Sequence, residues 1–299
     1  MSINEVQIEK GNLKNLVAEE FKLENPVKEF IRKFMKKKSA VVSLVFVLVL
    51  LGLALLQPTT HSITATDYNN ILVGPSADHW FGTDEYGRDV FSRIVTGTRM
   101  SLSVAISAVS IGAAIGTVLG IIAGYYGGIL ESLIMRFCDI LFSFPGILLA
   151  IGIVAIIGPG LGNVVIALAI SGIPNFTRII RSSTLSLKEQ LYIEAGRSIG
   201  VSDFRLLFRH ILPGTLPSFI VSYTMRIGTA IISASSLSFL GFGASPKNPD
   251  WGAMLSTGRD YIGVASHMIL FPGLMIFLTV LAFNILGDGL RDTLDPKLD

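Results

Sequence analysis

The sequence has few charged residues. Of its 299 residues, 15% are Asp, Glu, Lys or Arg and 51% are hydrophobic, whereas a soluble domain usually carries about 25% charged residues. The 24 basic and 22 acidic residues leave a net charge of +2, which is too small to create the positive field that attracts nucleic acid. A soluble enzyme and a nucleic-acid-binding protein are therefore disfavoured, and most of the chain is expected to lie in a bilayer.

Common metal-binding and catalytic patterns are also missing. The single cysteine, Cys138, allows neither a disulfide framework nor a thiolate metal site. No G-x-x-x-x-G-K-[ST] phosphate loop occurs, and a G-x-S-x-G match at 196–200 lacks the preceding strand that a nucleophile elbow requires. The histidines do not have metal-ligand spacing; they are His61, His79, His210 and His267. We therefore expect no catalytic residue and no metal ligand in this chain.

Six apolar segments approach the roughly 20 residues that a helix needs to cross a bilayer. They are residues 40–57, 99–124, 132–156, 161–180, 215–239 and 266–287. Pro145 and Pro174 are expected to interrupt the third and fourth segments, because proline removes a helix hydrogen bond. The sequence therefore predicts an all-α membrane protein with six transmembrane helices.

Basic residues near the helix ends predict which side each loop occupies. With a cytoplasmic N-terminus, fifteen basic residues lie inside and five outside, so both termini are predicted to be cytoplasmic. The tryptophans of the outer segments, Trp80 and Trp251, fit either an interfacial aromatic belt or a docking surface. The resulting organisation is a cytoplasmic arm 1–39, a first transmembrane helix 40–57, an extracytoplasmic segment 58–98, a five-helix core 99–290 and a cytoplasmic tail 291–299.

Glycine recurs at every fourth position of the second apolar segment. Such a stripe allows two helix backbones to approach closely, which favours helix association in lipid. The glycines are Gly112, Gly116, Gly120, Gly124 and Gly128. The pattern predicts packing against another helix, which could belong to this chain or to a second subunit.

Two charged residues lie within predicted spans. Asp139 is in the third span and Arg226 in the fifth. Charges in a membrane are costly and usually face protein or water. They therefore either line a translocation path or belong to an internal ion pair, and Arg226 has the further option of extending toward the membrane surface.

The inner loop 181–213 is predicted to form two short amphipathic helices. Gly200 suits a left-handed helix end between them, and Pro213 and Pro217 are expected to end the second helix. The predicted apolar faces are Leu187, Leu191 and Ala195 in the first helix and Phe204, Leu207, Phe208 and Ile211 in the second. Apolar faces in water need a partner; the alternative is a helix pair lying flat on the membrane.

This loop resembles the coupling loop of bacterial ABC-importer permeases, whose pattern is E-A-A, three residues, G, nine residues, I-x-L-P. The matching residues are Glu194, Ala195, Gly200, Leu212 and Pro213. Gly196 replaces the third-position alanine, and His210 stands at the isoleucine position, as is usual in the dipeptide/oligopeptide/nickel branch. Further stretches similar to that branch are residues 81–89, 237–243, 249–255 and 286–292.

The resemblance implies a type I ABC-importer permease fold in the bacterial cytoplasmic (inner) membrane. It also implies a non-catalytic subunit without a cofactor, paired with a homologous permease, two ATPases that bind ATP and Mg, and an extracytoplasmic substrate-binding protein. In the coupling loop, Glu194 would make a polar contact with an ATPase and Gly200 would form the bend. Apolar contact would come from Phe204, Leu207 and Phe208.

The expected cargo is a short peptide. Residues 134–151 and 225–240 are similar to the C-type permease of glutathione importers, so glutathione or di- and oligopeptides are the expected cargo. One alternative is a nickel or metal-chelate importer of the same family. The other is a stand-alone ion-coupled transporter, which would require charged pairs deep in several spans or internal repeats.

Overall fold

The computed structural model describes residues 26–59, 61–243 and 249–294. Within these ranges the secondary structure is helical, apart from an isolated bridge between Thr83 and Asp89. The long helices are α3 (Lys38–Leu56), α4 (Val90–Tyr126), α7 (Leu161–Lys188), α10 (Leu212–Phe239) and α12 (His267–Leu294). The shorter ones are α2 (Pro26–Met35), α5 (Gly128–Phe142), α6 (Gly146–Ile157), α8 (Leu191–Ser198), α9 (Asp203–Leu206), η1 (Leu207–Ile211), α11 (Trp251–Gly258) and η2 (Arg259–Tyr261).

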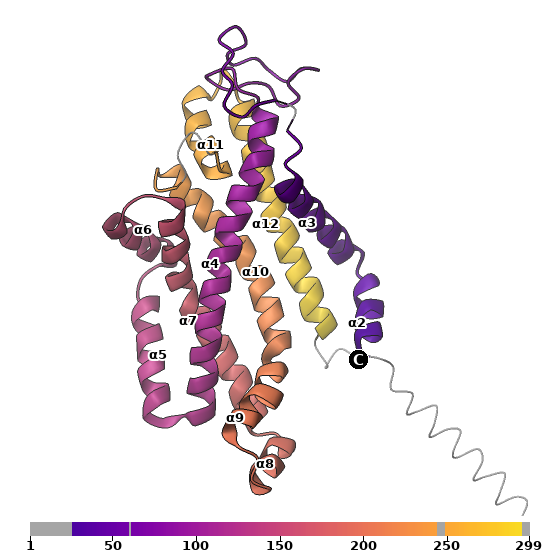
Figure 1. Ribbon diagram of the computed structural model, residues 1–299, viewed down its shortest axis with the longest axis vertical. Coiled ribbons are helices and arrows are strands. Elements are labelled where there is room, and N and C mark those ends of the chain that lie inside the picture. Colours follow the sequence, from indigo (N-terminus) through magenta and orange to yellow (C-terminus); the bar gives the residue numbers. More distant parts are fainter. Residues whose placement is uncertain (1–25, 60, 244–248, 295–299) are drawn as a thin grey trace, which may run out of the picture.

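The helices form an elongated bundle in which α4 runs nearly from end to end (Figure 1). The short helices α8 and α9 project from one end, whereas α11 and the segment before α4 lie at the other. The two ends of the bundle are therefore built from different parts of the chain.

Four helices are long and apolar enough to cross a membrane, namely α3, α4, α7 and α12. The bent pair α5 and α6 raises the number to five if it counts as one span. The helix α10 has 28 residues, but it carries nine Ser and Thr residues and is less apolar. The chain is therefore an all-α protein with four to five apolar spans, and the count of six stays a prediction.

The two prolines predicted to interrupt spans have different effects. Before Pro145 the third predicted span breaks, and α5 and α6 meet there at an angle of 86°. Pro174 lies buried inside α7, which continues through it. The predicted interruption at Pro174 is therefore wrong. Proline is tolerated within membrane helices when neighbouring helices support the backbone, and α7 packs extensively against α4.

The glycine stripe of α4 faces α7. The four glycines that contact α7 are Gly112, Gly116, Gly120 and Gly124. A Cβ atom at any of them would lie 2.6–2.8 Å from an α7 atom, which is closer than real Cβ atoms approach their neighbours. Gly128 instead begins α5 and has open space around it. The partner of this stripe is therefore a helix of the same chain.

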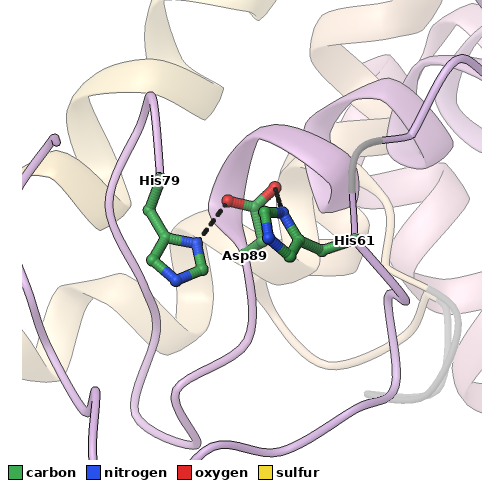
Figure 2. A group of neighbouring side chains, drawn as sticks. All are labelled: His61, His79 and Asp89. Atoms are coloured by element: carbon green, nitrogen blue, oxygen red, sulfur yellow. Dashed lines mark hydrogen bonds and ion pairs between the residues drawn. The ribbon is translucent and has the colours of Figure 1, made fainter. Parts of the chain in front are cut away.

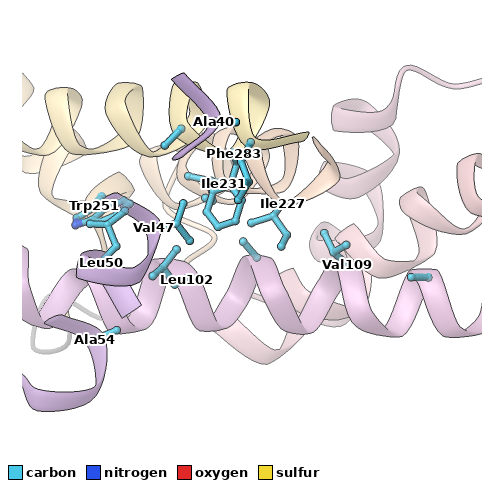
Figure 3. Close-up of a cluster of buried hydrophobic side chains, with 14 of the residues drawn as sticks. Ala40, Val47, Leu50, Ala54, Leu102, Val109, Ile227, Ile231, Trp251 and Phe283 are labelled. Carbon is cyan, nitrogen blue, oxygen red and sulfur yellow. The ribbon is translucent and has the colours of Figure 1, made fainter. Parts of the chain in front are cut away.

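A buried apolar cluster joins α3, α4, α10 and α12 (Figure 3). Val47, Leu102, Ile231 and Phe283 contribute from these four helices. Trp251 of α11 also belongs to the cluster; its side chain is fully buried and its Nε1 donates a hydrogen bond to the Ile94 carbonyl at 3.2 Å. Trp251 is thus a core residue, contrary to both predicted roles, because α11 packs against α10 and α12.

Candidate functional site

The projecting segment between α7 and α10 is the candidate site of coupling to a partner. After α7 ends at Lys188, α8 forms a short helix, and Gly200 then turns the chain with a φ of +81°. Gly200 N donates to Arg197 O at 2.9 Å and Val201 N donates to Gly196 O at 3.0 Å. This pair of bonds is the Schellman motif. Gly200 therefore adopts the left-handed conformation that the sequence predicts.

The second half of the segment is continuous with α10. From Asp203 the chain remains helical through α9 and η1 into α10. Leu212 N donates to Leu207 O, five residues back, so the helix widens by a π-turn before Pro213. The prediction that Pro213 and Pro217 end this helix is wrong, because the π-turn and α10 carry the helix past them.

The buried face of the segment differs from the predicted one. Ile193, Leu206 and Ile211 are almost completely buried and pack with Tyr125, at the end of α4. Leu191 is 82% exposed and Phe204 is 70% exposed. The predicted register fails because α7 and α8 are separate helices, and the break at 189–190 turns a different face of α8 toward the bundle.

Tyr125 connects the projecting segment to the bundle. Its carbonyl accepts a hydrogen bond from Lys188 Nζ at 2.7 Å, and its hydroxyl donates to the Asp203 carboxylate. The Arg197 guanidinium lies 4.8 Å from the centre of its ring. Sequence reasoning missed Tyr125, because these contacts come from segments more than 60 residues away; its position at the end of a predicted span was the only signal.

The outward side of the segment carries a set of exposed apolar residues, which we name the coupling surface. It consists of Leu191, Tyr192, Ile199, Phe204 and Phe208. The rings of Phe204 and Phe208 are tilted at 38° to each other, with centroids 4.4 Å apart. Exposed apolar patches of this kind mark sites of interaction with protein or membrane.

The remaining predicted residues of the loop occupy different environments. Glu194, Ala195 and Pro213 are exposed, while Leu207 is partly buried against the inner cluster. Gly196 is half-buried, and a Cβ there would lie 3.1 Å from Leu206 Cδ2. The structure therefore brings Glu194, Ala195, Phe204 and Phe208 to the outside, and it places Leu207 and Gly196 nearer the inner cluster.

The two charges within predicted spans lie in different places. Arg226 lines a cavity of about 350 Å³ between α4, α5, α6, α7 and α10, together with Ser171, Asn175 and Thr229. Asp139 is not part of this lining; its exposed carboxylate pairs with Arg178, which joins α5 to α7. Of the two alternatives drawn from the sequence, Asp139 therefore fits the internal ion pair, whereas Arg226 lines a cavity.

Buried charges also lie at the opposite end of the bundle. The Asp84 carboxylate accepts hydrogen bonds from the backbone N–H of Tyr86 and Arg88, and it pairs with the Arg88 and Arg93 guanidinium groups. Burial, and after it the negative charge of Asp84, raises the pKa of the Glu85 carboxyl above its usual range. This charged network fixes the turn that leads into α4.

The structure also brings together two histidines that are 18 positions apart. Figure 2 shows His61 and His79 on either side of the Asp89 carboxylate. The ligand atoms of these three residues all lie within 4.8 Å of one another. Spacing along the chain did not predict this group, because the loop fold brings it together.

Comparisons with known proteins identify the family. Residues 116–299, more than half of the chain, match the family described as the inner membrane component of binding-protein-dependent transport systems. The chain belongs to this family. Residues 25–75 of the permease also match the N-terminal transmembrane domain of oligopeptide transport permease C. The permease is therefore an inner-membrane protein of the dipeptide/oligopeptide type, in a family of non-catalytic membrane subunits.

Curated relatives cover nearly the whole permease. It is 55% identical over 276 residues to the glutathione transport system permease protein GsiD of Escherichia coli O6:K15:H31 (strain 536 / UPEC), which covers 91% of both chains. The glutathione transport permease of Shigella boydii serotype 4 (strain Sb227) matches with the same identity and coverage. The match extends across both the membrane helices and the loop that contains the coupling surface.

Solved structures share the fold. The inward-facing MetNI methionine ABC transporter, in its CY5 native crystal form, matches with a TM-score of 0.56 and 20% identity, covering 68% of this permease and 96% of that chain. An amino acid ABC transporter crystallised with histidines matches with a TM-score of 0.52 and 16% identity, covering 68% of this permease and 92% of that chain. These likenesses confirm the all-α ABC transporter permease fold.

Proposed function

We propose that this permease is a transmembrane subunit of an ATP-driven importer for short peptides such as glutathione. The cargo assignment is supported by its similarity to glutathione transport permeases over 91% of the chain. The structural observation that carries the coupling role is the projecting helix pair, which exposes apolar residues while its inner face is anchored to the bundle.

The proposed assembly contains a homologous permease, two ABC ATPases that bind ATP and Mg, and an extracytoplasmic binding protein. In this assembly all six predicted spans cross the membrane, with α5 and α6 as one bent span and both termini in the cytoplasm. The coupling surface then lies on the cytoplasmic side, where the ATPases bind. The segment containing Asp84, Asp89 and Arg93 lies on the other side, where the binding protein docks.

The contacts of Tyr125 suggest how force is transmitted. When the ATPases close on ATP, they push on α8 and α9. Because Tyr125 contacts both Lys188 and Asp203, the ends of α4 and α7 and the start of α9 move together. The push therefore tilts the long helices as rigid bodies and shifts the population toward a state open to the other side. Glu194 supplies a polar contact with an ATPase, and Phe204 and Phe208 supply apolar contact.

We assign the cargo path to the cavity that Arg226 lines. Peptides carry at least one carboxylate, and the planar guanidinium group binds a carboxylate with two parallel hydrogen bonds. Ser171, Asn175 and Thr229 add polar groups to the same wall. The ion pair of Asp139 with Arg178 instead holds α5 against α7.

Replacement of the bend glycine tests the coupling role. Gly200→Val places a β-branched residue at φ +81°, a strained conformation, and should abolish glutathione uptake by cells that contain the complete importer. Gly263→Val is the matched control, since Gly263 has a φ of +93°, similarly open surroundings and a position far from the coupling surface. The control should retain uptake at equal membrane abundance. Wild-type uptake by Gly200→Val would contradict the proposal.

A further inference from the structure

Three separate parts of the chain meet at the start of α4. His61 follows α3 by five residues, His79 belongs to the long segment after it, and Asp89 is the N-cap of α4 (Figure 2). The His79 Nδ1 atom lies 3.0 Å from Asp89 Oδ1, and the His61 Nδ1 atom lies 4.0 Å from Asp89 Oδ2. Two imidazoles therefore point their Nδ1 atoms at one carboxylate.

These ligand atoms suit a divalent transition-metal cation. Imidazole nitrogen and carboxylate oxygen bind Zn²⁺ at about 2.0–2.2 Å, so tetrahedral ligand atoms lie about 3.4 Å apart. The His79 separation is shorter than this value and the His61 separation is longer, each to a different oxygen of Asp89, and the ligand atoms of the three residues all lie within 4.8 Å of one another. The His61 side chain is 44% exposed, so a small rotation of its ring brings the third ligand into place while solvent supplies a fourth.

Hydrogen bonds already fix the framework of the site. The Asp89 carboxylate is buried and accepts a bond from Ser92 N at 2.8 Å, which orients it. The backbone N–H of His61 donates to Ser92 Oγ at 3.2 Å, and that of His79 donates to Ser76 Oγ at 3.1 Å. The bond to Asp89 is an outer contact that orients a metal ligand, and the two backbone bonds hold the loop segments that carry the histidines.

We propose that His61, His79 and Asp89 form a binding site for a divalent transition-metal cation, with Zn²⁺ as the probe. The cation would replace the direct contact of His79 with Asp89 and bring His61 into the same group. It would thereby tie the segment after α3 to the start of α4. The site is separate from the coupling surface and from the Arg226 cavity, so it does not depend on the proposed transport function.

Zinc titration tests the site directly. The full-length chain is purified in mild detergent through a tag without histidines, treated with a chelator, and titrated with Zn²⁺ against a zinc-sensitive dye. We expect one saturable Zn²⁺ per chain in the wild type. Because outer-shell changes alone weaken metal binding about 10–100-fold, loss of a ligand in His61→Ala or Asp89→Asn should weaken it at least about 10-fold.

The control variant is His210→Ala, which removes a histidine on η1 at the other end of the bundle and should retain wild-type zinc binding. Asp89→Asn keeps a side-chain oxygen able to cap α4, so the loss of affinity reports the missing charge and not the lost cap. Circular dichroism verifies that each variant is folded. Absence of saturable binding in the wild type, or equal affinity in wild type and His61→Ala, would overturn the proposal.

Discussion

Arg226 is the residue that we propose binds the carboxylate of the cargo. Arg226→Gln removes the positive charge from the cavity wall and keeps a polar side chain. Because a hydrogen bond to a charged group contributes about 1.5–3 kcal/mol, uptake efficiency should fall about 10- to 150-fold. The initial rate of glutathione uptake against concentration measures this change.

The control for this prediction is Arg259→Gln, because Arg259 is exposed, directly follows α11 and does not line the Arg226 cavity. It should transport glutathione at the wild-type rate. If Arg226→Gln reaches the membrane in normal amounts and also transports at the wild-type rate, Arg226 makes no contact with the cargo carboxylate.

A residue's role can be predicted from the sequence when it depends on residues nearby in the chain. The left-handed conformation of Gly200 could be predicted because it follows from neighbouring residues that end one helix and begin the next. The contacts of Tyr125 and the approach of His61 to His79 could not be predicted. Both depend on segments that are distant along the chain and meet only in the folded bundle.

At the scale of elements, the close packing of α4 against α7 depends on the absence of side chains at the glycine stripe. Gly120→Ala would place a Cβ 2.7 Å from the Thr177 carbonyl oxygen, so the helix backbones must separate. Overpacking of this kind costs about 1–3 kcal/mol. The midpoint of thermal unfolding in mild detergent should therefore fall.

Gly152→Ala is the matched control, since Gly152 lies in α6 with open space around it. This variant should unfold at or above the wild-type temperature, because alanine is the better helix former. Equal unfolding temperatures for the Gly120 and Gly152 variants would show that close approach along the stripe does not stabilise the bundle.

Helices were easier to predict than their faces. Long apolar runs predicted that α3, α4, α7 and α12 exist, because a helix needs about 20 mostly apolar residues to cross a bilayer. The buried face of α8 was predicted incorrectly because the helix breaks after Lys188, so residues before and after the break do not share one continuous helical face. The effects of Pro145 and Pro174 differ because packing against α4 supports α7 at the second proline, and neither outcome is visible in local sequence.

At the scale of the whole molecule, the two ends of the bundle differ in chemistry. One end carries the coupling surface, and the other carries the charged turn and the histidine pair. The long helix α4 reaches from Asp89, its N-cap at the second end, to Tyr125 at the first. A movement imposed on α8 and α9 can therefore reach the segment before α4 through one continuous element.

Site-specific photocrosslinking tests most directly whether the coupling surface contacts an ATPase. Phe204 is replaced by p-benzoylphenylalanine in the full-length chain, expressed with its partner subunits, and crosslinked proteins are identified by mass spectrometry. The same replacement of Phe277, an exposed aromatic residue on α12, is the control. We expect an ATPase adduct from position 204 and none from position 277. A folded chain that forms no ATPase adduct from position 204 would contradict it.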